Sequence, residues 1–390
     1  MVVTHTSYSC FREKWRQRRK LLQPAFHFSI LKKFVEVFRS ESKRLVHQLK
    51  EHENDELNIV PIISKFILSS TCETFMGTTL KSVDSQGKYY SSILKMGNIC
   101  VRRATEPWML FDILYSLTPM RWRQRKLLNY LHKFSSDIIA RRKKEFQDFM
   151  KLEGSNFESY SERKRLAMLD ILLSAQKESG IIDDEGIREE VDSFMFAGYD
   201  TTSLSLIHTI MLLANNRREQ DKIYEEIISV FGAEDTDVTM SQLQELKFME
   251  MCIKESLRIY PSAPLIARNP SEDVETKSGN IIPKDTSCII PIYDIHRKED
   301  TFPNPEVFDP YRFLPENIAK RHPFSYIPFS GGPRNCIGQR FALLELKCAL
   351  LEILRNFILE PVDTPQTVEF VLDIVLRPAG PIRVKFKTRK

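Results

Sequence analysis

The sequence predicts a mixed α+β fold that is mainly helical and has a smaller β-rich part. Glycine is scarce, at 13 of 390 residues, about half its usual share of roughly 7%, and scarce glycine favours long helices. Apolar residues recur at three- and four-residue steps through the first two thirds of the chain. Twelve of the twenty prolines then lie between Pro261 and Pro333, a spacing through which helices cannot run.

The clearest expected helix runs from Ser29 to Glu51. Phe34, Phe38 and Leu45 belong to its apolar stripe, and Ser29 is expected to cap its N-terminus. Further helices are expected near 59–76, 121–150, 166–178, 185–214, 217–231 and 248–260. The polar segment 154–163 opens with a glycine and is expected to be a loop.

The prolines of the last third favour short strands between them. Ser287 to Ile292 is one such β-like run, and the alternation of Ile382 to Phe386 predicts another strand near the C-terminus. One helix is expected to resume after Gly338 and to run to about Arg355. With no repeat and no clear linker, the chain is interpreted as one mixed domain.

Charge and cysteine content narrow the classes of function. The net charge is +5, which suits an acidic partner or an anionic membrane surface but is too weak to indicate nucleic acid. Seven cysteines include no CxxC pair, so zinc ribbons and redox dithiols are disfavoured. They are expected to be reduced thiols of a cytosol-facing protein, at least one of which is a candidate ligand.

Membrane and signal segments are not expected from the sequence. The chain has no apolar run of 18 residues, and its first ten residues are polar. A basic cluster at 141–144, on one face of an expected helix, is interpreted as solvent-exposed, with membrane or partner docking as the less favoured alternative.

The segment with the strongest chemical signal surrounds a single cysteine. It reads Phe329-Ser330-Gly331-Gly332-Pro333-Arg334-Asn335-Cys336-Ile337-Gly338. Three of the thirteen glycines fall within eight residues here, so the backbone must turn tightly or approach something closely. Loop N–H groups and the following helix N-terminus can stabilise a thiolate. A lone cysteine is more often a buried free thiol, but that alternative leaves the glycines, proline and arginine at fixed offsets unexplained.

This segment resembles the haem-ligand signature of the cytochrome P450 superfamily, Phe-x-x-Gly-x-Arg-x-Cys-x-Gly, at every fixed position. The resemblance implies that Cys336 is the proximal thiolate ligand of haem iron. It also implies that Arg334 binds a haem propionate. Phe329, Gly332 and Gly338 complete the implied haem-binding loop.

A second motif, Glu255-Ser256-Leu257-Arg258, places an acid and a base three residues apart on one helix face. Alone it would indicate only a surface ion pair. In the family it lies about this far before the cysteine, and Arg312 resembles the arginine that completes the Glu-Arg-Arg network. The implied role of Glu255, Arg258 and Arg312 is folding and haem retention.

A third motif, Ala197 to Thr202, places a glycine and two threonines inside the expected helix 185–214, where they are poor helix formers. A local kink with threonine back-bonding is one reading. The segment also resembles the family's Ala-Gly-x-Asp-Thr-Thr in the helix over the distal haem face. That resemblance implies that Gly198 opens a groove for O₂, and that Asp200 and Thr201 deliver protons.

Near the N-terminus, Trp15 and Arg19 fit the family's Trp-x-x-x-Arg propionate clamp, although a basic amphipathic helix would look similar. Arg268 matches a further propionate-binding position. The segment after Lys20 resembles the animal family 4 members, many of which hydroxylate fatty acids. Many of them carry Glu where this chain has Ala197, and that Glu can form an ester to a haem methyl. We therefore expect non-covalent haem b apart from the Cys336–iron bond, with fatty acid, terpenoid, steroid and xenobiotic substrates all open.

The resemblance covers residues 13–390 as a catalytic domain, and residues 1–12 are atypical. Family members typically carry a membrane anchor and further helices and strands before this point, so we expect a P450 fold that is incomplete at the N-terminus. The implied location is the cytosolic face of the endoplasmic reticulum membrane, and we expect no anchor within this chain.

The implied activity is insertion of one oxygen atom from O₂ into a lipophilic substrate. Electrons would come from NADPH through NADPH-cytochrome P450 reductase, with cytochrome b5 as a second candidate donor. The alternative is a haem-binding but inactive truncated fragment. A thiolate-haem isomerase or dehydratase ranks lower, because such enzymes often lose the acid–alcohol pair that Asp200 and Thr201 retain.

Overall fold

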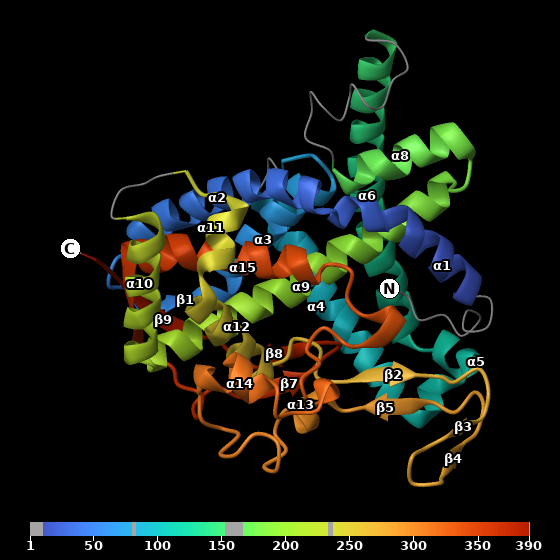
Figure 1. The fold of residues 1–390 in the computed structure, drawn as a ribbon. Helices are drawn as coiled ribbons and strands as arrows, with labels where there is room; N and C mark the ends of the chain where they lie inside the picture. The colour runs from blue at the N-terminus through green and yellow to red at the C-terminus, as the bar shows by residue number, and fades with distance from the viewer. Residues whose placement is uncertain (1–10, 80–82, 153–166, 233–236, 390) are drawn as a thin grey trace.

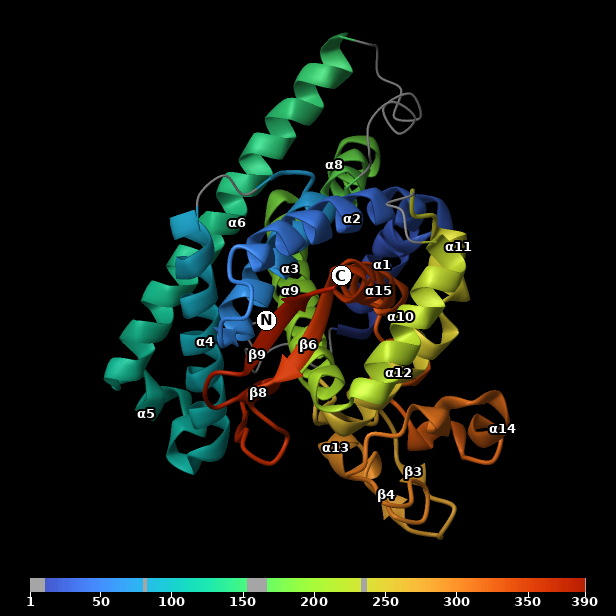
Figure 2. The ribbon, with the colours of Figure 1, turned by 90° about the vertical axis from the view of Figure 1, so that its left-hand side faces the viewer.

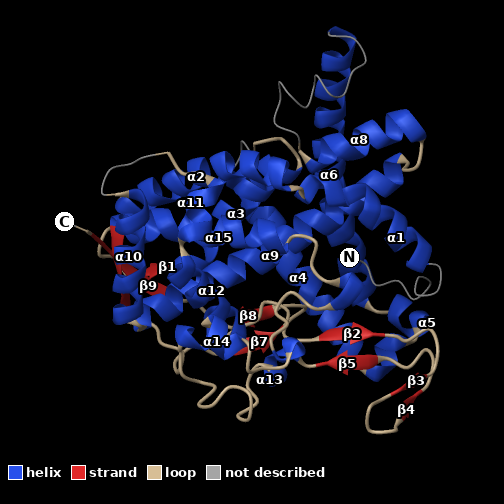
Figure 3. Ribbon diagram, viewed as in Figure 1, coloured by secondary structure: helices blue, strands red, loops and turns tan. Residues whose placement is uncertain are grey.

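The computed structural model describes residues 11–79, 83–152, 167–232 and 237–389 (Figure 1). The α-helices are α1 Phe11–Leu22, α2 Phe28–Lys50, α3 Ile59–Phe75, α4 Val83–Thr105, α5 Asp112–Ser116, α6 Pro119–Leu152, α8 Met168–Ser179, α9 Asp184–Asn215, α10 Arg217–Phe231, α11 Met240–Glu245, α12 Lys247–Ile259, α13 Ile292–Ile295, α14 Pro315–Ile318 and α15 Gln339–Asn356. The strands are β1 Leu57–Asn58, β2 Ile266–Arg268, β3 Val274–Glu275, β4 Ile281–Ile282, β5 Cys288–Ile290, β6 Phe357–Pro361, β7 Phe370–Leu372, β8 Leu376–Pro378 and β9 Arg383–Thr388. Helices dominate and the strands are few and short (Figure 3), which confirms the predicted mainly helical α+β class.

The strands form small antiparallel sheets. β1, β9 and β6 make a three-stranded sheet in that order, in which Phe357 pairs with Thr388 and Pro361 with Val384. The other three sheets are the pairs β2–β5, β3–β4 and β7–β8. β5 and β9 confirm the strands expected at 287–292 and 382–386. Figure 2 shows β6 and β9 beside α9 and α15.

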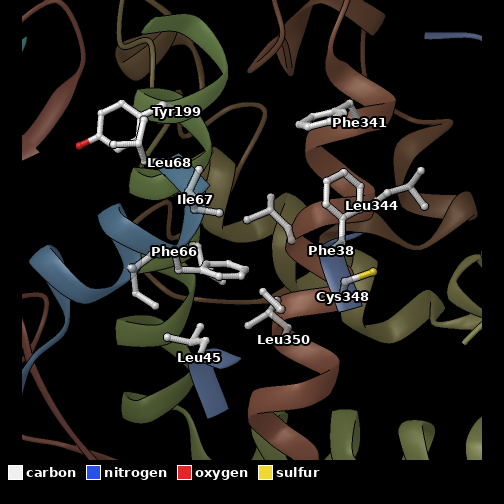
Figure 4. Packing of buried hydrophobic residues seen from close by; sticks show 14 of the residues in the cluster. Phe38, Leu45, Phe66, Ile67, Leu68, Tyr199, Phe341, Leu344, Cys348 and Leu350 are labelled. Atoms are coloured by element: carbon white, nitrogen blue, oxygen red, sulfur yellow. The ribbon is translucent and has the colours of Figure 1, made fainter. Parts of the chain in front are cut away.

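The core lies between α2, α3, α9 and α15 (Figure 4). Phe341 of α15 stacks on Phe75 of α3 with ring centroids 4.4 Å apart, and meets Phe38 of α2 edge-on at 4.9 Å. Residues 202–214 of α9 are all buried, as expected of a helix that neighbours surround on every side. α9 therefore serves as a rigid central element on which a site can be built.

Most helix limits agree with the sequence to within two residues, but three features of the helices were missed or predicted wrongly. α4 was not expected, because its serines and two glycines lower helix propensity. Ser29 does not cap α2: the helix begins at Phe28, His27 is the N-cap residue, and the Ser29 hydroxyl lies 3.1 Å from the His27 ring. The third concerns the basic cluster on α6.

The cluster at 141–144 is not simply solvated, because Arg142 is buried. Its guanidinium donates two 2.7 Å hydrogen bonds to Asp170 of α8 and one of 3.2 Å to the carbonyl of Gly77. A side chain at Gly77 would collide with it, since a Cβ there would lie 2.6 Å from the guanidinium carbon. Arg142 thus ties α6 to α8 and to the end of α3.

None of the described helices combines the length and apolar character that crossing a bilayer requires. The expected loop at 154–163 and the first ten residues lie outside the described part of the chain.

Candidate active site

The cysteine loop is closed by its own backbone. The N–H of Cys336 donates to the carbonyl of Phe329 over 2.9 Å, and the N–H of Asn335 donates to the carbonyl of Gly332 over 3.0 Å. Gly332 has a φ of +74°, a left-handed conformation that side chains disfavour. The glycine of the signature is therefore required by the turn itself.

Cys336 differs from the other free thiols in its exposure. Its side chain is exposed just before α15, whereas three others are buried: Cys72, Cys252 and Cys348. Neighbouring loop atoms partly desolvate the Cys336 sulfur and raise its pKa, while the N–H of Gly338 and the charge of Arg19 oppose that rise. The N–H group and the cation favour the thiolate, but the loss of solvent outweighs them in this structure, so the stabilised thiolate expected from the sequence stays a prediction.

A cavity of about 900 Å³ opens next to this loop. It is lined by residues of α1, α4, α6 and α9 together with the loop, among them Trp15, Arg19, Arg334 and Ile337. Arg19 donates to the backbone carbonyl of Asn335 over 2.6 Å and to its side-chain oxygen over 2.7 Å. The guanidinium of Arg334 lies over the Trp15 ring at 4.3 Å. Three of the predicted propionate residues thus meet at one cavity.

Arg268, the fourth of them, reaches the loop from β2. Its Nη2 donates to the Ser330 hydroxyl over 2.6 Å. Ser330 has a φ of 62°, and this bond helps to hold it in that uncommon conformation.

The Glu255–Arg258 pair is fully buried and bidentate, not a surface pair. Arg258 Nε and Nη2 each donate to a Glu255 oxygen over 2.8 Å. Arg258 also donates to the carbonyls of His296 over 3.0 Å and Pro305 over 2.6 Å. Arg312 Nε lies 3.4 Å from the same carboxylate, so the three predicted network residues do meet.

His296 extends this network toward the cysteine loop and was not predicted. Its Nε2 accepts the N–H of Ile327 over 2.8 Å, two residues before Phe329. Burial lowers the pKa of His296 to about 3, so the ring is neutral and can accept. No signal in the sequence indicated this role of His296, because a histidine in a proline-rich loop does not lie at a characteristic spacing from the residues that it contacts.

In α9, Thr201 and Asp200 face different surroundings. The Thr201 hydroxyl donates to the carbonyl of Ala197 over 2.7 Å, the back-bonding considered as one reading of this motif. Asp200 is buried and forms an ion pair with Arg377 of β8. Burial raises the pKa of Asp200, and Arg377 opposes the rise. In the described part of the chain no hydrogen bond joins the two side chains, and Arg377 is a site residue that the sequence did not reveal.

Gly198 packs against α3. A Cβ at this position would lie 2.8 Å from Phe75 Cε2 and 3.4 Å from Thr71 Cγ2. The close approach of α9 and α3 accounts for the glycine, and a groove for O₂ remains a prediction.

Residues 4–386 of the sequence match the model of the protein family described as "Cytochrome P450". It is 40% identical over 386 residues to Cytochrome P450 4c3 of Drosophila melanogaster, a match that covers 96% of this chain and 72% of that protein. It is also 40% identical over 380 residues to Cytochrome P450 4V2 of Homo sapiens, with the same coverage. The fold resembles the crystal structure of the haem domain of a cytochrome P450DA mutant, with a TM-score of 0.81, 22% identity, and coverage of 98% of this chain and 79% of that one.

Proposed function

Because this chain belongs to the cytochrome P450 family, and so is a haem monooxygenase, we propose that Cys336 is its iron ligand and that its substrate is a lipophilic small molecule. The observation that carries this proposal is that Trp15, Arg19 and Arg334 line one cavity together with Ile337, the residue that follows the exposed Cys336. The cavity also has apolar lining from Ile93, Met96, Leu131 and Phe194, as a lipophilic substrate requires.

The residues present fit a haem. A cavity of about 900 Å³ is within the range of roughly 300–1,000 Å³ typical of ligand sites. Arg19 binds two oxygens of Asn335, which stand in for a carboxylate such as a propionate. Arg334 and Arg268 are the further propionate partners in this proposal, with Trp15 beside Arg334. Phe329, Gly332 and Gly338 shape the backbone around Cys336. Thiolate-ligated haem, when bound, supplies the O₂-activating chemistry.

Thr201 and Asp200 are proposed to supply protons. The Thr201 hydroxyl donates its proton to the Ala197 carbonyl, so its oxygen can accept a hydrogen bond from a donor. To relay a proton, the hydroxyl would turn its own O–H from that carbonyl toward the cavity as it takes up the donor's proton. We place the protein at the cytosolic face of the endoplasmic reticulum membrane, with NADPH-cytochrome P450 reductase and cytochrome b5 as electron donors. The exposed Arg16, Lys20 and Arg340 offer positive charge to such acidic partners.

Replacing Thr201 by Ala should uncouple the reaction. Since a positioned proton relay is usually worth about 10²- to 10⁴-fold, we expect product formed per O₂ consumed to fall by roughly tenfold or more, with peroxide released instead. Product, O₂ and peroxide are measured together in protein reconstituted with NADPH and the reductase. Thr202→Ala, an adjacent buried hydroxyl, is the control and should stay coupled. Tight coupling in Thr201→Ala would remove the proton role.

Haem should be extractable without breaking a covalent bond. Ala197 offers no carboxylate for an ester, so acidified organic solvent should remove all haem from the wild-type protein. Ala197→Glu restores the family 4 residue and should leave part of the haem attached after turnover. Mass spectrometry of the denatured protein measures whether haem remains covalently attached in each variant. A wild-type chain that carries haem mass would show that another residue forms the bond.

An exposed apolar surface between α4 and α6 supports docking to a membrane. We call it the apolar surface; its residues are Trp108, Leu110, Phe111, Ile113, Leu114, Leu117 and Trp122, which are between 46% and 79% exposed. Arg121, Arg123, Arg125 and Lys126 beside it are also exposed. Apolar side chains with a basic margin suit an anionic bilayer surface.

The double variant Phe111→Ser, Leu117→Ser should weaken binding to vesicles that contain anionic lipid. Burying each side chain is worth about 1.5–3 kcal/mol when complete, so we expect at least about a tenfold loss of affinity in a flotation assay. Ile318→Ser on α14, which lies away from α5 in both views (Figures 1 and 2), should bind as the wild type does. Equal binding by the double variant would exclude this surface.

A further inference from the structure

The β7–β8 hairpin is fastened to the turn of α9 that carries the proposed proton donors. The N–H of Leu376 donates to the carbonyl of Ser262 over 3.0 Å. The Ser262 hydroxyl in turn donates to the carbonyl of Thr201 over 2.8 Å. One serine therefore links the hairpin to the backbone of the site.

The same hairpin supplies a buried ion-pair cluster. Arg377 Nη2 contacts one oxygen of Asp200, and Arg377 Nε donates to Asp373 over 2.9 Å. The side chains of Arg377 and Asp373 are each 10% exposed and that of Asp200 is 1% exposed. Two carboxylates thus share one guanidinium. The second oxygen of Asp200 is buried, and the described part of the chain offers it no hydrogen-bond partner, so it is the atom that can carry a proton.

The cluster lies directly behind the wall of the cavity. Asp373 packs so closely on α4 that a Cβ at Gly97 would collide with its Oδ1. The same oxygen accepts the N–H of Ile374 over 2.8 Å. Gly97 and Ile374 both line the cavity, so the residues next to Asp373 form part of the cavity wall.

We propose that Arg377 is the positioning residue for Asp200, and that Asp373 competes for the guanidinium and limits how firmly Asp200 is held. This inference rests on the proposed function, in which Asp200 passes protons to Thr201. In each cycle Asp200 takes up one proton on its second oxygen and releases one toward the Thr201 hydroxyl through intervening water, since no hydrogen bond joins the two side chains directly, so the charge of Asp200 is restored. Arg377 favours the ionised form of Asp200, which takes up the proton. Asp373 favours the protonated form of Asp200, which releases it.

Arg377 and Asp373 carry opposite charges, so their removal should shift the pKa of Asp200 in opposite directions. Besides Arg377 and Asp373, the titratable groups facing Asp200 are Tyr89 and Tyr90 of α4 and Tyr199 of α9; burial raises the pKa of each, so all three stay neutral. Removal of the cation should raise the pKa of Asp200, and removal of the second carboxylate should lower it.

The test is the pH profile of product formed per O₂ consumed, with the full chain, haem, NADPH, the reductase and a fatty acid as the probe substrate. Arg377→Gln should move the Asp200-dependent limb to higher pH and Asp373→Asn to lower pH, each by about one unit. Arg377→Lys, which keeps the charge, should restore most of the wild-type profile. Arg383→Gln breaks a similar bidentate pair, with Asp363, and should leave the profile unchanged. The proposal would be overturned if Arg377→Gln and Asp373→Asn shifted the profile in the same direction or did not shift it. An unchanged profile in Asp200→Asn would also overturn it.

Hydrogen exchange gives a second readout that needs no turnover. Arg377→Gln and Asp200→Asn should both speed amide exchange across residues 370–378, in protein with and without haem, because each removes the ion pair between the hairpin and α9 and leaves only the Ser262 link. Unchanged exchange in both variants would overturn the positioning role alone. A wild-type chain without a thiolate–haem spectrum would overturn the proposed function alone, since the exchange result would stand.

Discussion

Cys336→Ala is expected to remove thiolate-ligated haem and to lower product formation at least about 10³-fold, which corresponds to about 4 kcal/mol of transition-state stabilisation. Cys336 is the thiol that the closed loop presents in an exposed position beside the cavity. Alanine keeps the turn, because the N–H of residue 336 still reaches the Phe329 carbonyl, but it supplies no ligand. Haem content, the absorption spectrum and turnover are measured on the purified variant.

Cys288→Ala is the matched control for this change. Cys288 is also a free thiol, on β5 and away from the cysteine loop in sequence, so its loss should leave both the spectrum and turnover as in the wild type. If Cys336→Ala kept a thiolate–haem spectrum while Cys288→Ala lost it, the ligand would have been assigned to the wrong cysteine.

The second large effect is expected from Arg258→Ala, through folding. The guanidinium is fully buried and holds both oxygens of Glu255 together with the carbonyls of His296 and Pro305. Its removal leaves a buried carboxylate without its main partner, a change that usually costs about 3–5 kcal/mol. Because His296 accepts from Ile327 next to the cysteine loop, haem retention should fall together with the urea midpoint.

Arg217→Ala provides a surface comparison. Arg217 pairs with Asp221 over 2.7 Å, but the two side chains are 52% and 40% exposed, and such pairs contribute only about 0–1 kcal/mol. Comparable urea midpoints for Arg258→Ala and Arg217→Ala would contradict the account of the buried network. Arg258→Lys should recover only part of the stability, because lysine cannot bind both oxygens in a bidentate manner.

Sequence reasoning predicted what depends on local pattern. The apolar periodicity located α9 to within one residue at each end, and the proline spacing marked where helices give way to short strands. The fixed offsets around Cys336 predicted a tight turn, and Gly332 does have a positive φ. These features follow from residues close together in the chain, so a single sequence carries them.

Features that depend on contacts between distant segments were not predictable. Arg142 looked like part of a charged helix face, yet it pairs with Asp170 across 28 positions. Asp200 and Arg377 are 177 positions apart, and nothing local to either residue reveals the pair. The direction in which Asp200 points therefore had to come from the structure.

The assignment of Cys336 as the thiolate ligand of haem iron is tested most directly by the absorption spectrum of the reduced, CO-treated wild-type protein. A thiolate ligand should give the long-wavelength Soret band, and Cys336→Ala should lose that band. A wild-type protein that binds haem but shows only the shorter-wavelength band of another axial ligand would contradict it.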